Sequence, residues 1–352
     1  MSRLLELVKN ITLSNFSELK SPYRLTYILT YRCHFKCGMC NIWKKAAGSE
    51  LSMEQIENFF DTSNRFSWIN LSGGEIFLRK DLPEVLDAIL TKCKCLYLLD
   101  FPTNGYESGL ITDTVRKIIT KYRLPKLLVT VSLDGPKELH NQIRGVPGSW
   151  DKAVETFAEL RKLRSGRFNV FFGTTLQPLN MDHFEETLDS VNRLIGQVAH
   201  DDFHINIAHS SSHYYGNPDA FRNNDSAALW NRVDRISAYR KGSPLDPVVF
   251  LEKRYQELSK IYLANNKSPV PCQALSASFF MDPAGDVYPC SIYDKSIGNI
   301  MDYDYDIRKL WAADYRIRIR KEIRSGLCPH CWTPCEAYQS ILANLIPKLK
   351  GA

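Results

Sequence analysis

The stretch Tyr31-Arg-Cys-His-Phe-Lys-Cys-Gly-Met-Cys40 places three thiols, Cys33, Cys37 and Cys40, in a C-x3-C-x2-C spacing. It follows the apolar run 24–31, which is typical of a strand, so the thiols are predicted on a loop at the carboxyl end of that strand. Three cysteines can hold one side of a metal centre, but they cannot close a tetrahedral zinc site or bind every iron of a [4Fe–4S] cube. Either a distant ligand completes the set, or one position on the metal stays open.

A structural zinc site or three unrelated thiols is the alternative interpretation of this loop. Zinc motifs usually pair two C-x2-C or Cys/His knuckles. Here His34 lies inside the loop, and no second knuckle follows within the usual interval. The spacing therefore favours an iron–sulfur cluster over zinc.

Six apolar runs alternate with helical patterns from residue 24 onward. The strands are predicted at 24–31, 66–72, 95–101, 126–133, 168–175 and 202–208, and the helices between them at 51–60, 82–92, 110–122, 150–163 and 183–195. Such alternation predicts a parallel sheet with right-handed crossovers, and nearly continuous apolar strands indicate burial on both faces. Six units are too few for a closed eight-fold barrel, so we expect an α/β fold with a partial (β/α)6 TIM-like barrel.

Polar and glycine residues follow these strands at the carboxyl ends, where barrel enzymes carry their active sites. They are Ser72, Gly73, Gly74, Glu75, Asn104, Ser132, Asp134 and Arg144. Glycines let the backbone approach a ligand, hydroxyls and carboxylates can bind ribose, and a guanidinium suits a carboxylate. Each also has an ordinary interpretation: a strand-to-helix turn for the glycine pair, a stabilised turn for Asn104, and a surface loop for residues 132–145.

Five further cysteines lie near the C-terminal end: Cys272, Cys290, Cys328, Cys331 and Cys335. The run 277–290 predicts a β-hairpin turning at 283–285, after two bridging helices at 227–238 and 249–263. Five thiols are enough to hold a whole cluster, although the C-x2-C spacing leaves zinc as an alternative. Cys93 and Cys95 fall at the opposite end of the barrel, and we expect them to be plain thiols outside the site.

The cysteine triplet and the Gly73-Gly74-Glu75 turn resemble the cluster and GGE motifs of radical S-adenosylmethionine (SAM) enzymes. The C-x12-G-x4-C hairpin around Gly285 resembles the opening of the SPASM/twitch domain found in many of them. The resemblance extends from residue 24 to about residue 336. It departs from the family pattern at Met39, where an aromatic residue is usual, and at Ile76, where proline is usual.

The resemblance implies specific cofactor ligands. A [4Fe–4S] cluster is expected on Cys33, Cys37 and Cys40, with SAM chelating the open iron. Contacts to SAM are expected from Gly73, Gly74, Glu75, Asn104, Ser132, Asp134 and Arg144. The chain has too few cysteines for two auxiliary clusters, so one auxiliary [4Fe–4S] cluster is expected on Cys272, Cys290, Cys328 and Cys331, with Cys335 as a substitute ligand or near neighbour.

The implied reaction is reductive cleavage of SAM, with an electron from a flavodoxin- or ferredoxin-type donor. The resulting 5′-deoxyadenosyl radical would take a hydrogen atom from the substrate. The auxiliary cluster could accept an electron, giving oxidation or a new bond; if it is only structural, epimerisation or rearrangement is possible. The subclass, oxidoreductase or isomerase, stays open.

The substrate class is open too. We expect a small molecule, such as a sugar, aminoglycoside or lipid precursor, rather than a ribosomal peptide, because no clear peptide-binding domain precedes the barrel. A non-enzymatic electron-transfer protein is a third alternative. The polar segment after the sixth strand offers His209, His213, Tyr214 and Tyr215 as substrate-pocket candidates. A purely structural loop is an equal alternative for this segment.

The composition places limits on location and partners. The net charge of +6 is spread along 352 residues, so nucleic acid is not expected. No apolar run is long enough for a membrane span and no signal-peptide pattern opens the sequence, so we expect a cytoplasmic protein. Its ten cysteines then favour metal chemistry over disulfides.

Four regions follow from these patterns: an amphipathic lead-in at 1–23, the barrel at 24–220, a helical bridge at 221–271 and the auxiliary domain at 272–352. The lead-in places Leu4, Val8 and Ile11 on one helical face. That face is expected to cap the fold, with peripheral membrane contact as a weaker alternative.

Overall fold

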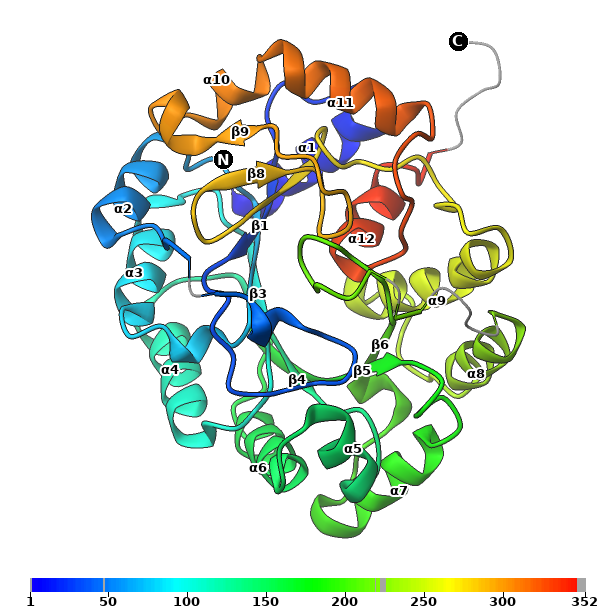
Figure 1. Cartoon of the computed structure of the whole chain (residues 1–352). Helices are drawn as coiled ribbons and strands as arrows, with labels where there is room; N and C mark the ends of the chain where they lie inside the picture. Colours follow the sequence, from blue (N-terminus) through cyan, green and yellow to red (C-terminus); the bar gives the residue numbers. More distant parts are fainter. Residues whose placement is uncertain (1, 47, 219, 222–225, 347–352) are drawn as a thin grey trace.

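The computed structural model describes residues 2–46, 48–218, 220–221 and 226–346 (Figure 1). Within these residues the strands form one nine-stranded sheet in the order β6-β5-β4-β3-β2-β1-β7-β8-β9. The first six are β1 (Arg24–Ile28), β2 (Trp68–Ser72), β3 (Leu98–Thr103), β4 (Lys126–Ser132), β5 (Phe168–Leu176) and β6 (Phe203–Ile207). Each of the six pairs in parallel with its neighbour. The predicted partial (β/α)6 barrel is confirmed.

Helices surround the barrel on its outer side (Figure 1). They are α2 (Met53–Thr62), α3 (Leu82–Lys92), α4 (Ser108–Lys121), α5 (Lys137–Arg144), α6 (Ser149–Arg161), α7 (Phe184–Ile195), α8 (Ser226–Ala238) and α9 (Pro247–Asn265). The sequence explains how α2 begins, because Ser52 and Gln55 exchange side-chain and backbone hydrogen bonds as a capping box. The sequence patterns do not predict α5, which ends at Gly145 in a left-handed conformation (φ 67°).

Strand β3 begins at Leu98 rather than at Cys95. Residues 92–96 are used in a tight turn after α3, in which Lys94 N–H donates to Lys92 O and Leu96 N–H to Cys93 O. A backbone committed to such a turn cannot also join a strand ladder. Cys95 therefore lies in the turn before the strand.

The inner face of the barrel is polar, which corrects the expectation of nearly continuous apolar strands. In β2, Asn70 and Ser72 line an internal cavity, whereas Ile69 and Leu71 belong to the apolar core. The same alternation recurs in the other strands. Side chains alternate between the two faces of a strand, so the outer face alone carries the apolar contacts with the helices.

The C-terminal region extends the same sheet. Strand β7 (Ser278–Met281) pairs in parallel with β1 and antiparallel with β8 (Asp286–Tyr288), which pairs with β9 (Gly298–Asn299). The predicted hairpin is confirmed, and its turn places Gly285 at a φ of 89°. Helices α10 (Ile307–Trp311), α11 (Asp314–Arg324) and α12 (Pro334–Leu342) follow.

Helices α9 and α12 occupy the gap between the edge strand β6 and the β1–β7 pair. Glu252 of α9 accepts from the backbone N–H of Ile205 in the edge strand β6 (2.8 Å) and from the hydroxyl of Tyr338 in α12 (2.6 Å). On the other side of the gap, Arg24 of β1 donates to Gln339 of α12. These contacts close a barrel that has too few strands to close itself.

Helix α1 (Arg3–Phe16) lies against the outside of this assembly. Its apolar contacts come from Leu7 and Ile11, which pack with Tyr23 and Ala277. Leu4 and Val8 are about half exposed, so the face that caps the fold differs from the one predicted from the sequence.

Candidate active site

The cysteine loop after β1 crosses the mouth of the barrel (Figure 1). Cys33, Cys37 and Cys40 all line one cavity of about 340 Å³. Helix α5 anchors the loop, because Gly38 N–H donates to Ile143 O (2.9 Å). Three thiols that the chain spaces over eight residues therefore face a common space.

The Gly73-Gly74-Glu75 turn packs directly on the cysteine loop. Gly74 N–H donates to Thr30 O and Glu75 N–H to Arg32 O, both at 2.9 Å. A side chain at Gly74 would place its Cβ 2.2 Å from Arg32 O, and one at Gly73 would lie 2.4 Å from Thr30 O. Only glycine fits this approach, so the glycine pair fixes the distance between the turn and the thiols.

The carboxylate of Glu75 faces away from the cavity and supports its wall. It accepts hydrogen bonds from the Thr103 hydroxyl at both oxygens (3.1 Å each) and from Asn104 N–H (2.7 Å). Burial raises its pKa to about 7, against these hydrogen bonds, which lower it. Glu75 thus positions the end of β3 in this structure.

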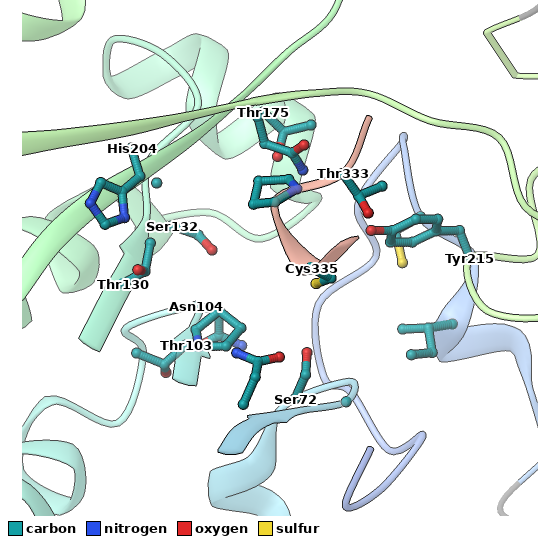
Figure 2. A pocket seen from close by; sticks show the side chains of 18 of the residues that line it. Ser72, Thr103, Asn104, Thr130, Ser132, Thr175, His204, Tyr215, Thr333 and Cys335 are labelled. Carbon is teal, nitrogen blue, oxygen red and sulfur yellow. The ribbon is translucent and has the colours of Figure 1, made fainter. Parts of the chain in front are cut away.

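Asn104 and Ser132 both line the cavity (Figure 2). The amide oxygen of Asn104 accepts from Tyr106 N–H (2.9 Å), which leaves its Nδ2 buried with no partner among the described residues. A buried donor without a partner is costly. Asn104 is therefore part of the cavity wall, and its Nδ2 is an unpaired donor buried within that wall.

Asp134 is fully buried and does not line the cavity. It forms an ion pair with Arg144 (2.5 Å) and accepts from Thr175 N–H (2.8 Å). Burial raises the pKa of Asp134, and the Arg144 guanidinium opposes that rise. Arg144 itself lines the cavity, with its Nη1 3.9 Å from Cys37 Sγ. Asp134 therefore holds Arg144, and Arg144 faces the ligand space.

The three thiols fit an iron–sulfur cluster. Burial raises the pKa of Cys33 to about 12 and that of Cys40 to about 11; it also raises the pKa of Cys37, although Arg144 lowers it. Without metal these thiols are protonated at neutral pH, whereas cluster ligands are thiolates. Iron would add positive charge to that of Arg144 beside the thiols, and the buried Phe35 and Met39 pack against them.

Residues 209–217, here called the clasp, connect to the cysteine loop and the glycine turn. Asn217 Nδ2 donates to Met39 O (2.7 Å), and Asn41 N–H donates to Tyr215 O (2.7 Å). The hydroxyl of Tyr214 donates to Gly73 O (3.1 Å). The clasp thus fixes both walls of the cysteine site, and Tyr214 and Tyr215 line the cavity.

The same clasp also contacts the C-terminal cysteine region. Trp332 N–H donates to His209 Nε2 (3.0 Å), and His209 Nδ1 lies 2.6 Å from Ile207 O. Burial lowers the pKa of His209 to about 4, so both ring nitrogens of a neutral imidazole are used structurally. His213 lies outside the main cavity, where its Nε2 bonds Cys290 O (3.0 Å).

Four of the C-terminal cysteines lie around a second, small cavity. Its lining includes Cys272, Cys290, Cys328 and Cys331, which are the four predicted auxiliary ligands. Burial raises the pKa of Cys272 and Cys328, so this donor set, too, fits metal bound by thiolates. Cys335 does not line this cavity; it lines the main one instead. Cys93 and Cys95 line neither cavity.

Several residues of the main cavity belong to none of the motifs recognised in the sequence. They are Arg24, Asp100, Thr130, Thr175 and His204 (Figure 2 labels the last three). Every one lies on an inner face of a strand, at an alternate position to a core residue. The signal was present as alternation within each strand, for example Leu128-Val-Thr-Val-Ser132.

Comparison with known proteins agrees with this geometry. Residues 27–191 match the radical SAM superfamily, and residues 272–332 match SPASM, an iron–sulfur cluster-binding domain. The chain therefore belongs to the radical SAM superfamily and carries a SPASM domain, and its cofactors are SAM and [4Fe–4S] clusters.

Two relatives cover most of the chain. The antilisterial bacteriocin subtilosin biosynthesis protein AlbA of Bacillus subtilis is 26% identical over 334 residues, covering 91% of this chain and 68% of AlbA. The AdoMet-dependent heme synthase of Methanosarcina barkeri is 23% identical over 329 residues, covering 88% of each chain.

Solved structures share the fold. Streptococcus suis SuiB bound to S-adenosylmethionine has a TM-score of 0.59 at 16% identity, covering 88% of this chain and 70% of SuiB. SuiB is also known bound to its precursor peptide SuiA, with the same TM-score. Within the described part of the chain, none of the helices could cross a membrane.

Proposed function

We propose that this chain is a radical SAM enzyme that acts on a substrate held in the 340 Å³ cavity. The observation that carries the proposal is that the three N-terminal thiols, the glycine turn and the polar inner faces of the strands line a single space. When bound there, the cluster and SAM supply a carbon radical through reductive cleavage of a carbon–sulfur bond of SAM.

The residues around the cavity have distinct proposed roles. Cys33, Cys37 and Cys40 hold the cluster. Arg144, held by Asp134, offers its guanidinium to the carboxylate of SAM. Ser132 offers a hydroxyl to the cofactor, and Asn104 forms part of the same wall. Glu75 acts indirectly, because it positions the end of β3 in the cavity wall. Gly73 and Gly74 bring the backbone of their turn close to the cysteine loop.

We further propose one auxiliary [4Fe–4S] cluster on Cys272, Cys290, Cys328 and Cys331. Their common cavity supports this ligand set. A flavodoxin- or ferredoxin-type protein in the cytoplasm would reduce the enzyme. The oxidoreductase or isomerase outcome depends on the substrate.

A peptide is the proposed substrate class. AlbA acts in subtilosin biosynthesis, and the fold of the chain is similar to that of SuiB, which binds a precursor peptide. The sequence-based preference for a small molecule receives no support from these proteins. It stays as a second candidate because the heme synthase, named for a small-molecule product, matches this chain over 88% of both lengths.

Cofactor cleavage tests the proposed function. Full-length protein, reconstituted anaerobically with iron and sulfide, is expected to convert SAM to 5′-deoxyadenosine after reduction. Cys33→Ala should abolish this product, measured by mass spectrometry, because the cluster loses a ligand. Cys95→Ala, a thiol outside both cavities, is the matched control and should retain it. Formation of 5′-deoxyadenosine by Cys33→Ala would refute the assignment, as would zinc in place of iron.

A further inference from the structure

The end of the barrel opposite the cysteine loop carries a set of exposed basic side chains. The loops that enter β2, β3, β4 and β5 span residues 63–67, 93–97, 122–125 and 162–167, so they lie together at the amino ends of the strands. None of these four loops contains an acidic residue. Each contributes an exposed cation to what is here called the basic rim: Arg65, Lys94, Arg123 and Arg167.

Helix α1 lies across this end of the barrel. Arg3 donates to the carbonyl oxygens of Lys94 (3.1 Å) and Arg123 (2.9 Å), in the loops before β3 and β4. Asn10 Nδ2 donates to Ser67 Oγ in the loop before β2 (3.4 Å). The helix therefore covers the amino ends of the strands and lies beside the basic rim.

The outward side of α1 is apolar. Leu5 is 57% exposed and Phe16 is 69% exposed, and Leu4 and Val8 are about half exposed. At about 100° per residue, Leu5 and Phe16 point almost directly away from Leu7, which is buried against the barrel. An exposed group of large apolar side chains on a charged surface marks an interaction site.

The last described residues extend this apolar patch. Asn15 of α1 donates to Leu342 O (2.8 Å) and accepts from Ile346 N–H (3.1 Å). Leu345 and Ile346 are 45% and 43% exposed. The sequence continues as Pro347-Lys-Leu-Lys350, which adds two lysines and no acidic residue directly after the patch.

We propose that this end of the barrel binds the surface of a membrane that contains anionic lipids. The apolar patch enters the boundary between headgroups and acyl chains, and the basic rim contacts the anionic headgroups. In this orientation the cysteine loop faces away from the membrane, so that substrates reach the cavity from solution. The inference is independent of the proposed function.

A second copy of the chain fits this surface less well than a lipid bilayer does. The patch exposes on the order of 500 Å² of apolar surface, below the ~800 Å² per partner of a stable protein interface. Pairing two copies through the patch would also bring two basic rims together, and like charges repel.

Vesicle flotation tests the apolar patch with the full-length reconstituted protein. The wild type is expected to float with vesicles of equal parts phosphatidylglycerol and phosphatidylcholine, and far less with phosphatidylcholine alone. Rising salt should release it, because salt screens the basic rim. Leu5→Ser/Phe16→Ser should weaken binding about tenfold or more. The matched control is Leu110→Ser/Leu179→Ser, which alters two leucines of similar exposure (49% and 56%) that follow β3 and β5 at the opposite end, and it should bind as the wild type does.

Charge is tested separately from apolar contact. Lys94→Gln should weaken binding to the mixed vesicles about fivefold. The control Lys80→Gln alters an exposed lysine between β2 and α3, at the cavity end of the barrel, and should have no effect. Iron content and thermal unfolding equal to those of the wild type show that each variant is folded.

Several results would overturn the proposal. They are a wild type that does not float, equal flotation with the two kinds of vesicle, and flotation of Leu5→Ser/Phe16→Ser equal to that of the wild type. A wild-type dimer that dissociates in Leu5→Ser/Phe16→Ser, measured by light scattering without lipid, would assign the patch to a second copy instead.

Discussion

The ion pair with Asp134 holds the positively charged guanidinium of Arg144 toward the cavity. The carboxylate is fully buried and the guanidinium is 11% exposed, so each depends on the other. The pair of Lys137 and Asp151 offers a contrast, because both side chains are about half exposed at a similar separation (2.8 Å). Breaking a buried pair leaves an uncompensated charge, whereas water replaces an exposed one.

Asp134→Asn is expected to weaken both folding and SAM binding. Asparagine can still accept from Thr175 N–H, but it cannot neutralise Arg144, so the free energy of unfolding should fall by about 3–5 kcal/mol. The affinity for SAM should fall about tenfold or more as Arg144 loses its orientation. Asp151→Asn is the matched control and should change stability by less than about 0.5 kcal/mol. Urea unfolding and calorimetric titration with SAM measure both effects; equal behaviour of the two variants would contradict the role of Asp134.

At the scale of elements, the clasp joins the two cysteine regions. One segment of nine residues bonds Met39 and Gly73 on one side, and Cys290 and Trp332 on the other. The clasp residues chosen from the sequence as substrate contacts therefore also have structural roles. Tyr214 is the clearest case, because its hydroxyl bonds Gly73 O and Ser72 Oγ.

Tyr214→Phe should loosen the glycine turn without removing a cluster ligand. The loss of these hydrogen bonds is worth about 1–2 kcal/mol, so the Kd for SAM should rise about fivefold or more. Iron content should not change. The control is Tyr239→Phe, which alters an exposed tyrosine outside the cavity. If titration of the reconstituted variants gives the same Kd for both, the hydroxyl does not position the turn.

At the scale of the whole molecule, stability depends on the seam where α12 meets β1 and β7. Glu336 is buried there and accepts at Oε2 from Ser278 in β7 (2.9 Å) and from Gln339 (2.7 Å). Its Oε1 has no partner among the described residues. Burial raises the pKa of Glu336 to about 7, although Arg24 opposes this rise.

The seam should therefore make stability depend on pH. Between pH 4.5 and 7 the folded protein retains a proton on Glu336 that the unfolded chain has lost, so this contribution is full below pH 4.5 and is lost as pH rises to 7. Glu336→Gln removes this titration and should be the more stable protein at pH 8, by up to about 3 kcal/mol. Denaturant unfolding from pH 5 to 8 measures this change, with Glu159→Gln, at a partly exposed surface position, as control. If the free energy of unfolding of Glu336→Gln changes with pH in parallel with that of the wild type, Glu336 is not the group that titrates.

Some errors in prediction were local, such as the start of β3 and the polar inner faces of the strands, and one came from long-range contacts. The hairpin and the strand–helix alternation were predicted, because each depends on residues close in sequence. The position of Cys335 was not. Its spacing from Cys331 resembles a ligand run, but the start of α12 at Pro334 turns its side chain into the other cavity. The Thr333-Pro334 pair was a usable signal for that helix start.

The sequence by itself determined the position of the cysteine loop, the glycine turn and the partial-barrel fold, because local spacing and strand–helix alternation specify them. Only the tertiary structure decided which distant residues share a cavity. Arg24 and Cys335 are separated by 311 positions, yet β1 and α12 place them together where the barrel lacks strands. No pattern of spacing encodes such a contact, since it depends on how the last helix fills the gap that six strands leave open.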